Sequence, residues 1–140
     1  MDQRLRMYGL RLRTKILGDG NCQFRAVADL MWPGDQEAHS VVRAAAIEWL
    51  RKHADTEMKP GDPETKVRCF IHGESWDDYL RRMSRDREWG DELTLRAIAN
   101  QYQIVLCVLS DVVAKGSSSP VREIAPLSGA EDKPHHWLAH

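Results

Sequence analysis

One stretch of the chain combines a tight turn, a cysteine and the start of an apolar helical pattern: Gly18-Asp19-Gly20-Asn21-Cys22-Gln23-Phe24-Arg25-Ala26. The glycines at 18 and 20 tolerate the backbone angles of a turn, and Asn21 is a residue type that favours the N-cap of a helix. The apolar spacing predicts a helix that begins at Asn21 or Cys22 and ends before the Trp-Pro-Gly-Asp sequence at 32–35. We therefore expect Cys22 in the first turn of a helix.

A cysteine in this position can act as a nucleophile. Unpaired backbone N–H groups and the positive end of the helix dipole lower the pKa of a thiol and can hold an oxyanion. The residues alone leave a second interpretation open, in which Cys22 is a small packing residue beside Phe24 and Ala26. A phosphate-binding loop is excluded, because neither a third glycine nor a Gly-Lys-Ser/Thr ending follows.

Apolar residues recur at helical spacing in three later segments. They predict helices from about Gln36 to His53, from Trp76 to Met83, and from Asp91, as N-cap, to Tyr102. The second half of the chain changes character, and the continuous apolar run at 104–109 predicts a buried central strand. Because helices come first and strands cluster late, the expected class is α+β, a small β-sheet covered by helices.

Shorter elements complete the expected layout. Extended segments are predicted at 14–17, at 121–124 and from 137 to the last residue, and exposed loops at 55–65 and 116–120. Most of the five tryptophans are expected to be core anchors, and Trp89 is also a candidate to shape a substrate channel.

Length and charge narrow the classes of protein. The 140 residues suit one domain spanning 1–140, and 20 Lys and Arg against 21 Asp and Glu give a formal net charge of −1. This balance argues against a nucleic-acid-binding surface or a polybasic membrane anchor. The chain shows no long apolar run and no signal peptide, and its three cysteines suggest no disulfide framework. We therefore expect a soluble, monomeric protein that is cytoplasmic or also nuclear.

The stretch around Cys22 resembles the nucleophile motif of the ovarian-tumour (OTU) family of cysteine proteases, which remove ubiquitin. Further segments similar to the same family lie in the family's order along the chain, one before this stretch at 4–10 and three after it at 39–50, 78–84 and 88–95. The resemblance implies a papain-like OTU fold, ubiquitin or ubiquitinated proteins as partners, and no metal or organic cofactor.

The resemblance also implies roles for individual residues. Cys22 matches the nucleophile, which attacks the carbonyl of the glycine that ends ubiquitin, and Asp19 matches the active-site aspartate. Gly20 and Asn21 lie in the loop whose backbone N–H groups, with that of Cys22, would hold the oxyanion. The implied activity is a thiol-dependent deubiquitinase that hydrolyses isopeptide bonds.

The general base is the point where this sequence departs from the family pattern, a His-aromatic-Asn or His-aromatic-Asp motif near the end of the domain. His136 is followed by Trp137, but Leu138 stands where a polar residue is expected. A better alignment matches 137–140 to the strand before the catalytic histidine, so that the base lies beyond His140 and the domain misses its final strand. His140 itself is a third candidate. If the base is missing, the alternative function is a catalytically impaired ubiquitin-binding or scaffold module.

Two pairs have metal-ligand spacing, Cys69 with His72 and His136 with His140. No Cys-x-x-Cys partner accompanies them, so we expect no metal site. Cys107, inside the apolar run, is expected to be structural.

Overall fold

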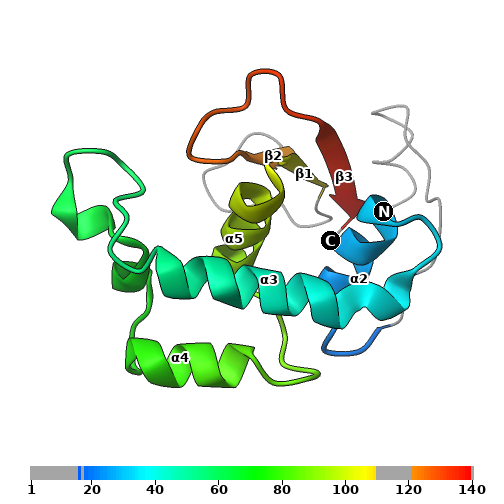
Figure 1. The fold of residues 1–140 in the computed structure, drawn as a ribbon, viewed down its shortest axis with the longest axis horizontal. Helices are drawn as coiled ribbons and strands as arrows, with labels where there is room; N and C mark the ends of the chain where they lie inside the picture. The colour runs from blue at the N-terminus through cyan, green and yellow to red at the C-terminus, as the bar shows by residue number, and fades with distance from the viewer. Residues whose placement is uncertain (1–15, 17, 110–120, 140) are drawn as a thin grey trace.

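The computed structural model describes residues 16, 18–109 and 121–139 (Figure 1). The elements are the helices α2 (Cys22–Met31), α3 (His39–Lys52), α4 (Trp76–Met83) and α5 (Glu92–Tyr102), followed by the strands β1 (Val105–Leu109), β2 (Val121–Ile124) and β3 (His135–Ala139). Three short 3₁₀ helices lie in the connections, η1 (Gln36–Ala38), η2 (Pro63–Thr65) and η3 (Val67–Phe70). The α+β prediction is confirmed.

The sheet is mixed, with strand order β2-β1-β3. Strand β1 is antiparallel to β2, with Cys107 opposite Glu123, and parallel to β3, with Val105 opposite His135. All five residues of β1 are buried. The apolar run at 104–109 therefore forms the central strand, as predicted.

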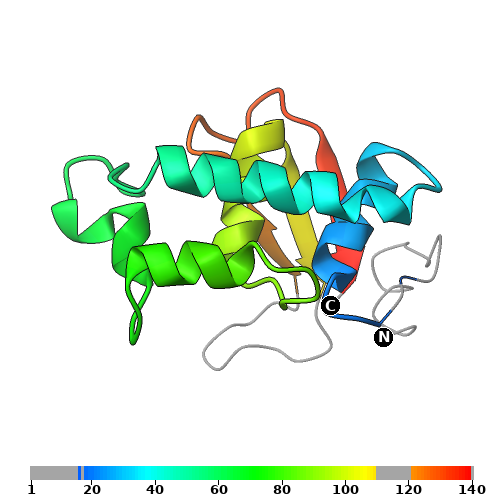
Figure 2. The ribbon, with the colours of Figure 1, turned by 60° about the horizontal axis from the view of Figure 1, so that its bottom comes forward.

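The two faces of the sheet have different surroundings. Leu106 and Val108 of β1, Ile124 of β2 and Leu138 of β3 belong to the core that the sheet shares with the helices. Because side chains alternate along a strand, the odd-numbered residues of β1 point to the opposite face. Helix α3 runs across the helical layer and packs against α2 and α5 (Figures 1 and 2).

Helix α5 begins as its sequence predicts. The Asp91 carboxylate accepts a hydrogen bond from the N–H of Thr94 at 2.9 Å, and the Asp91 N–H donates to Thr94 Oγ1 at 2.8 Å. This reciprocal capping box satisfies two amides at the helix start. The segment predicted to be helical from Gln36 begins instead with the 3₁₀ turn η1, and α3 starts at His39.

Several predictions concern residues that the structure does not describe. The extended segment at 14–17, apart from Ile16, the loop at 116–120, the similarity at 4–10 and His140 all lie outside the described residues. Within the described residues, no helix combines the length and the apolar character that crossing a bilayer requires.

Candidate active site

Cys22 is the first residue of α2, as predicted, and its side chain is half-buried. The Cys22 N–H donates to the carbonyl oxygen of Asp19 at 3.1 Å, which closes the turn before the helix. The thiol thus stands where a tight turn becomes a helix, the location that the nucleophile motif implies.

Burial raises the pKa of the Cys22 thiol, and the negative charge of Asp19 adds to the effect, against the backbone hydrogen bond from Gln23. The backbone amides at the helix start do lower this pKa, but the net shift is upward, so the expectation of a lowered thiol pKa is wrong. The physical reason is desolvation of the thiolate, which the amides of the first turn do not outweigh. In the described part of the chain no histidine is hydrogen-bonded to Cys22 Sγ.

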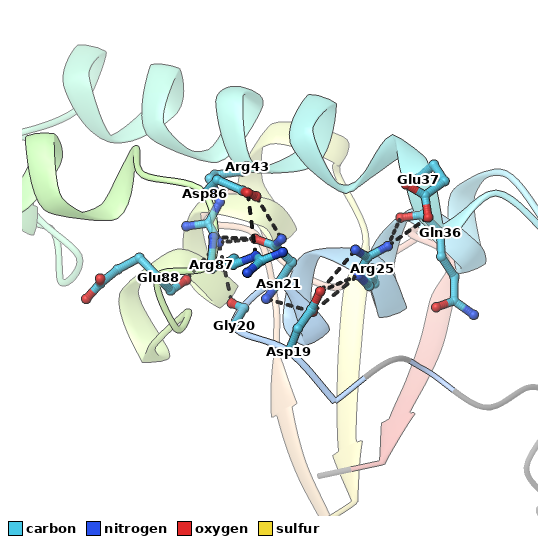
Figure 3. Close-up of polar contacts among 10 residues, drawn as sticks. All are labelled: Asp19, Gly20, Asn21, Arg25, Gln36, Glu37, Arg43, Asp86, Arg87 and Glu88. Atoms are coloured by element: carbon cyan, nitrogen blue, oxygen red, sulfur yellow. Dashed lines mark hydrogen bonds and ion pairs between the residues drawn. The ribbon is translucent and has the colours of Figure 1, made fainter.

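Asp19 lies three residues before the cysteine and is held by Arg25. Its carboxylate accepts from Arg25 Nε at 3.2 Å, from Arg25 Nη2 at 3.0 Å and from the Asn21 N–H at 3.0 Å (Figure 3). The hydrogen bond from Arg25 lowers the pKa of Asp19, so the carboxylate is ionised at neutral pH. Arg25 also pairs with Glu37 at 3.1 Å, which links the turn to η1.

The Asn21 side chain is buried and is hydrogen-bonded to α3 and to the 84–91 loop. Its Oδ1 accepts from Arg43 Nη2 at 2.7 Å and from the Arg87 N–H at 2.9 Å, and its Nδ2 donates to Asp86 Oδ1 at 2.8 Å. Asn21 occupies the N-cap position of α2, but its side chain makes no capping hydrogen bond. The predicted capping role is therefore wrong, because these long-range partners take up the amide.

Arg43 of α3 is the centre of this polar cluster (Figure 3). Its buried guanidinium also donates to the carbonyl oxygens of Met83 and Glu88, each at 2.7 Å, and lies 4.2 Å from the centroid of the Phe24 ring. An amphipathic helix is expected to turn its charged residues to solvent, so the burial of Arg43 was not predicted from the sequence. A signal was present, since position 43 falls on the apolar stripe, three residues before Ala46 and seven before Leu50.

Gly20 lies in the turn before α2, but its φ is not positive, so the reason for a glycine at this position is close packing. A Cβ at this position would overlap the carbonyl oxygen of Arg87, so the turn and the 84–91 loop pack backbone against backbone. Of the predicted oxyanion amides, that of Asn21 donates to Asp19 Oδ1 and that of Cys22 to Asp19 O. Each would have to exchange its present bond for one to an oxyanion.

The same loop carries an exposed tryptophan. Trp89 is 60% exposed, whereas Trp49 is buried as predicted. Trp32 and Trp137 are exposed as well, so the prediction that most of the tryptophans are core anchors is wrong. Trp89 precedes Gly90, which packs so closely on the Gln23 side chain that a Cβ would overlap it.

His136 lies near the start of β3, opposite Leu106, and shares the helix-facing side of the sheet with Leu138. Figures 1 and 2 agree that the C-terminal end of β3, rather than its beginning, lies beside the start of α2. At about 3.3 Å per residue, His136 is roughly 10 Å back along the strand from Ala139. His136 remains an untested candidate for the base.

A different cysteine and histidine, Cys107 of β1 and His135 of β3, lie close together on the sheet. Cys107 Sγ and His135 Nδ1 are 3.7 Å apart on the face of the sheet away from the core helices. Burial, and then the charge of Glu123, raise the pKa of the Cys107 thiol. Cys107 lies in the middle of β1, whereas Cys22 is the first residue of α2, so Cys107 lacks the helix-start position that makes Cys22 a candidate nucleophile.

The chain has recognisable relatives. Residues 17–135 match the sequence profile of the family described as OTU-like cysteine protease. The chain is 37% identical over 109 residues to OVARIAN TUMOR DOMAIN-containing deubiquitinating enzyme 10 of Arabidopsis thaliana, which covers 76% of this chain and 26% of that protein. It thus spans about a quarter of that relative's length.

Two solved structures share the fold. The OTU domain of OTUD1 aligns with a TM-score of 0.73 and 21% identity, covering 99% of this chain and 83% of that chain. The Hazara virus OTU bound to ubiquitin aligns with a TM-score of 0.61 and 21% identity, covering 90% of this chain and 73% of that chain. The papain-like OTU fold implied by the sequence is confirmed.

Proposed function

Because the chain belongs to the OTU-like cysteine protease family, we propose that it is a thiol-dependent deubiquitinase that hydrolyses isopeptide bonds at the ubiquitin C-terminus. The observation that carries the proposal is the placement of Cys22 at the start of α2, directly after the turn at 18–21. The Arabidopsis relative described as a deubiquitinating enzyme and the viral OTU bound to ubiquitin support the choice of substrate.

The chemistry proposed is acyl transfer through a thioester. A histidine takes the Cys22 proton, the thiolate adds to the carbonyl of the terminal glycine of ubiquitin, and backbone amides of residues 20–22 stabilise the oxyanion. The imidazolium then protonates the leaving lysine amine. Water, deprotonated by the same histidine, hydrolyses the thioester, so that ubiquitin leaves as a carboxylate and the thiol is regenerated.

The raised pKa of Cys22 makes the base essential. A thiol whose burial disfavours the thiolate needs an imidazole within hydrogen-bond reach before it becomes nucleophilic at neutral pH. We place this imidazole at or after the C-terminal end of β3, because that end of the strand lies beside α2 (Figure 2). His136, farther back along β3, is the competing candidate.

We also propose that Trp89 lines the path of the ubiquitin tail. Its ring is exposed on a loop that is held to the nucleophile turn by the Arg87 N–H bond to Asn21. Replacing it by alanine should raise KM with little change in kcat, since uniform binding energy is lost. The matched control is Trp32→Ala, which removes another exposed tryptophan.

The test of the main proposal uses the full-length natural protein and ubiquitin with a thiol-reactive electrophile at its C-terminus. We expect one covalent adduct, which is lost in Cys22→Ala and kept in the control variant Cys69→Ala, because Cys69 is an exposed cysteine in η3. Absence of an adduct with the wild-type protein, or an adduct that persists in Cys22→Ala, would overturn it.

One observation favours a second candidate function, a ubiquitin-binding or scaffold module without turnover. In the described residues Cys22 has no histidine partner, and its thiol is held protonated by burial. The two functions separate in one pair of measurements. A module binds ubiquitin but leaves a fluorogenic ubiquitin substrate intact, whereas an enzyme cleaves it and loses cleavage in Cys22→Ala.

A further inference from the structure

Three side chains of metal-ligand type gather on the sheet face opposite the helical core. They are Cys107 of β1, Glu123 of β2 and His135 of β3, one from each strand. Their ligand atoms all lie within 4.8 Å of one another. None of the three takes part in the chemistry proposed for Cys22.

The register of the sheet explains why these residues meet. Cys107 is directly opposite Glu123 in the antiparallel pair, and His135 is opposite Val105, two residues from Cys107 on the parallel side. A two-residue offset keeps side chains on the same face of a sheet. Backbone hydrogen bonds of three strands therefore fix the three Cα atoms, and the group is arranged before any ligand arrives.

The distance between the ligand atoms of Cys107 and His135 suits a metal ion with tetrahedral coordination. Typical zinc bonds of about 2.3 Å to sulfur and 2.0–2.1 Å to imidazole nitrogen, at a tetrahedral angle, separate the two ligand atoms by about 3.6 Å. The observed distance between Cys107 Sγ and His135 Nδ1 is 3.7 Å. The Glu123 and His135 side chains are exposed, so small rotations can complete the approach of the carboxylate.

We propose that Cys107, Glu123 and His135 bind a zinc ion, with water at the fourth position. A thiolate, an imidazole and a carboxylate together form a ligand set that binds zinc in preference to magnesium or calcium. On binding, the Cys107 thiol releases its proton to the solvent and the sulfur becomes a thiolate ligand. Neither oxidant nor reductant is involved.

The site would act on the sheet as a clamp. A single ion would join β2, β1 and β3, and β3 is the strand whose end lies beside the start of α2 (Figure 1). Binding to the folded chain alone stabilises it in proportion to the logarithm of zinc concentration. This clamp is independent of turnover at Cys22, so it can be tested whether or not the protein hydrolyses ubiquitin.

The experiment measures metal binding by the chain carrying Cys22→Ser and Cys69→Ser, which leaves Cys107 as its single thiol. After chelator dialysis under a phosphine reductant, zinc is titrated against a chromophoric chelator and cobalt is titrated by absorbance. We expect one equivalent of zinc and a cobalt spectrum with a thiolate charge-transfer band. Glu123→Gln and His135→Gln should each weaken zinc binding at least about tenfold, since even the loss of an outer-shell partner of a metal ligand costs about that much.

The control is His136→Gln, which changes the neighbouring histidine on the other face of β3 and should leave binding unchanged. Cys107→Ser should abolish the charge-transfer band. If that variant fails to fold, as judged by circular dichroism, the two exposed positions decide the outcome. The proposal is overturned if micromolar zinc is not retained, or if Glu123→Gln and His135→Gln bind zinc as tightly as their parent.

Discussion

Arg43 Nη2 donates a hydrogen bond to Asn21 Oδ1 over 2.7 Å, in the interior of the protein and one residue from the candidate nucleophile. The same guanidinium reaches the carbonyl oxygens of Met83 and Glu88. A residue of α3 thus holds the turn before Cys22 against the loop that follows α4. The position of the turn that precedes the Cys22 thiol therefore depends on this buried cluster.

The first prediction concerns the side-chain amide of Asn21, which accepts a hydrogen bond from Arg43 in this cluster. Asn21→Ala leaves a buried guanidinium, a backbone N–H and a carboxylate short of one partner each, so we expect a loss of about 3 kcal/mol in the free energy of unfolding. Urea denaturation measures it. Gln101→Ala, on the exposed side of α5, should change stability by less than about 0.5 kcal/mol. Equal effects of the two substitutions would contradict the structural role of Asn21.

The second prediction compares two glycines of the same turn. Gly20→Ala forces a methyl group into the Arg87 carbonyl oxygen, so the turn and the 84–91 loop must separate, at a cost of about 3 kcal/mol or more. A Cβ at Gly18 meets no atom within 4 Å, so Gly18→Ala should be nearly neutral. Thermal unfolding of the pair, with labelling of Cys22 by the ubiquitin electrophile, checks both stability and site geometry.

The third prediction concerns Asp19 and pH. The hydrogen bond from Arg25 lowers the pKa of Asp19, so its stabilising effect is fully present above the ordinary aspartate pKa of about 3.9 and is lost as pH falls through the lower folded value. The difference in the free energy of unfolding between wild type and Asp19→Asn should therefore be constant near neutral pH and disappear at acid pH. Urea unfolding at a series of pH values measures it. The control is Asp35→Asn, because the Asp35 side chain is exposed and makes no capping hydrogen bond. If its stability difference from wild type also disappears in acid, the assignment of the effect to Asp19 is refuted.

The fourth prediction tests how α4 is tied to α5. The buried Tyr79 hydroxyl donates to both carboxylate oxygens of Asp91, at 3.0 and 2.8 Å, and burial raises the pKa of Tyr79 well above its ordinary value. Tyr79→Phe should cost about 2 kcal/mol, constant between about pH 6 and 9, because the phenol stays protonated there. Tyr102→Phe is the matched control, with an expected change below about 0.5 kcal/mol.

The fifth prediction reads the state of Cys22 directly. Because burial raises the pKa of its thiol, alkylation by iodoacetamide should be slow at neutral pH and accelerate about tenfold per pH unit up to about pH 9. Mass spectrometry of the Cys22 peptide gives the rate. A rate independent of pH near neutrality would instead show a thiolate stabilised by a neighbouring histidine, and its loss in His136→Ala would identify that residue as the base.

Much of the local structure could be predicted from sequence patterns. The start of α2 at Cys22, the limits of α4, the cap at Asp91 and the central strand all follow from spacing and residue type, which act within a few residues. The length of α3 was overestimated at its first turn, because Gln36–Ala38 forms a 3₁₀ turn that apolar periodicity does not distinguish from an α-helix.

What sequence patterns missed depends on residues far apart in the chain. Asn21 is a residue type that favours N-caps, yet its side-chain hydrogen-bond partners come from positions 43, 86 and 87. No local rule predicts these distant partners. The pKa of Cys22 was predicted in the wrong direction for a related reason. The helix dipole can be read from the position of the cysteine, whereas the burial that outweighs it comes from tertiary packing.

The buried position of Arg43 also has a consequence for how the protein folds. Its guanidinium finds its acceptors only when segments around residues 21, 43, 83 and 88 have come together, so the turn that presents Cys22 cannot be assembled from local structure alone. Opening of this cluster should therefore expose the amides of the turn and of the 84–91 loop to hydrogen exchange together, as one cooperative unit. A nascent or partly unfolded chain carries the cysteine without the geometry that would make it a selective reagent.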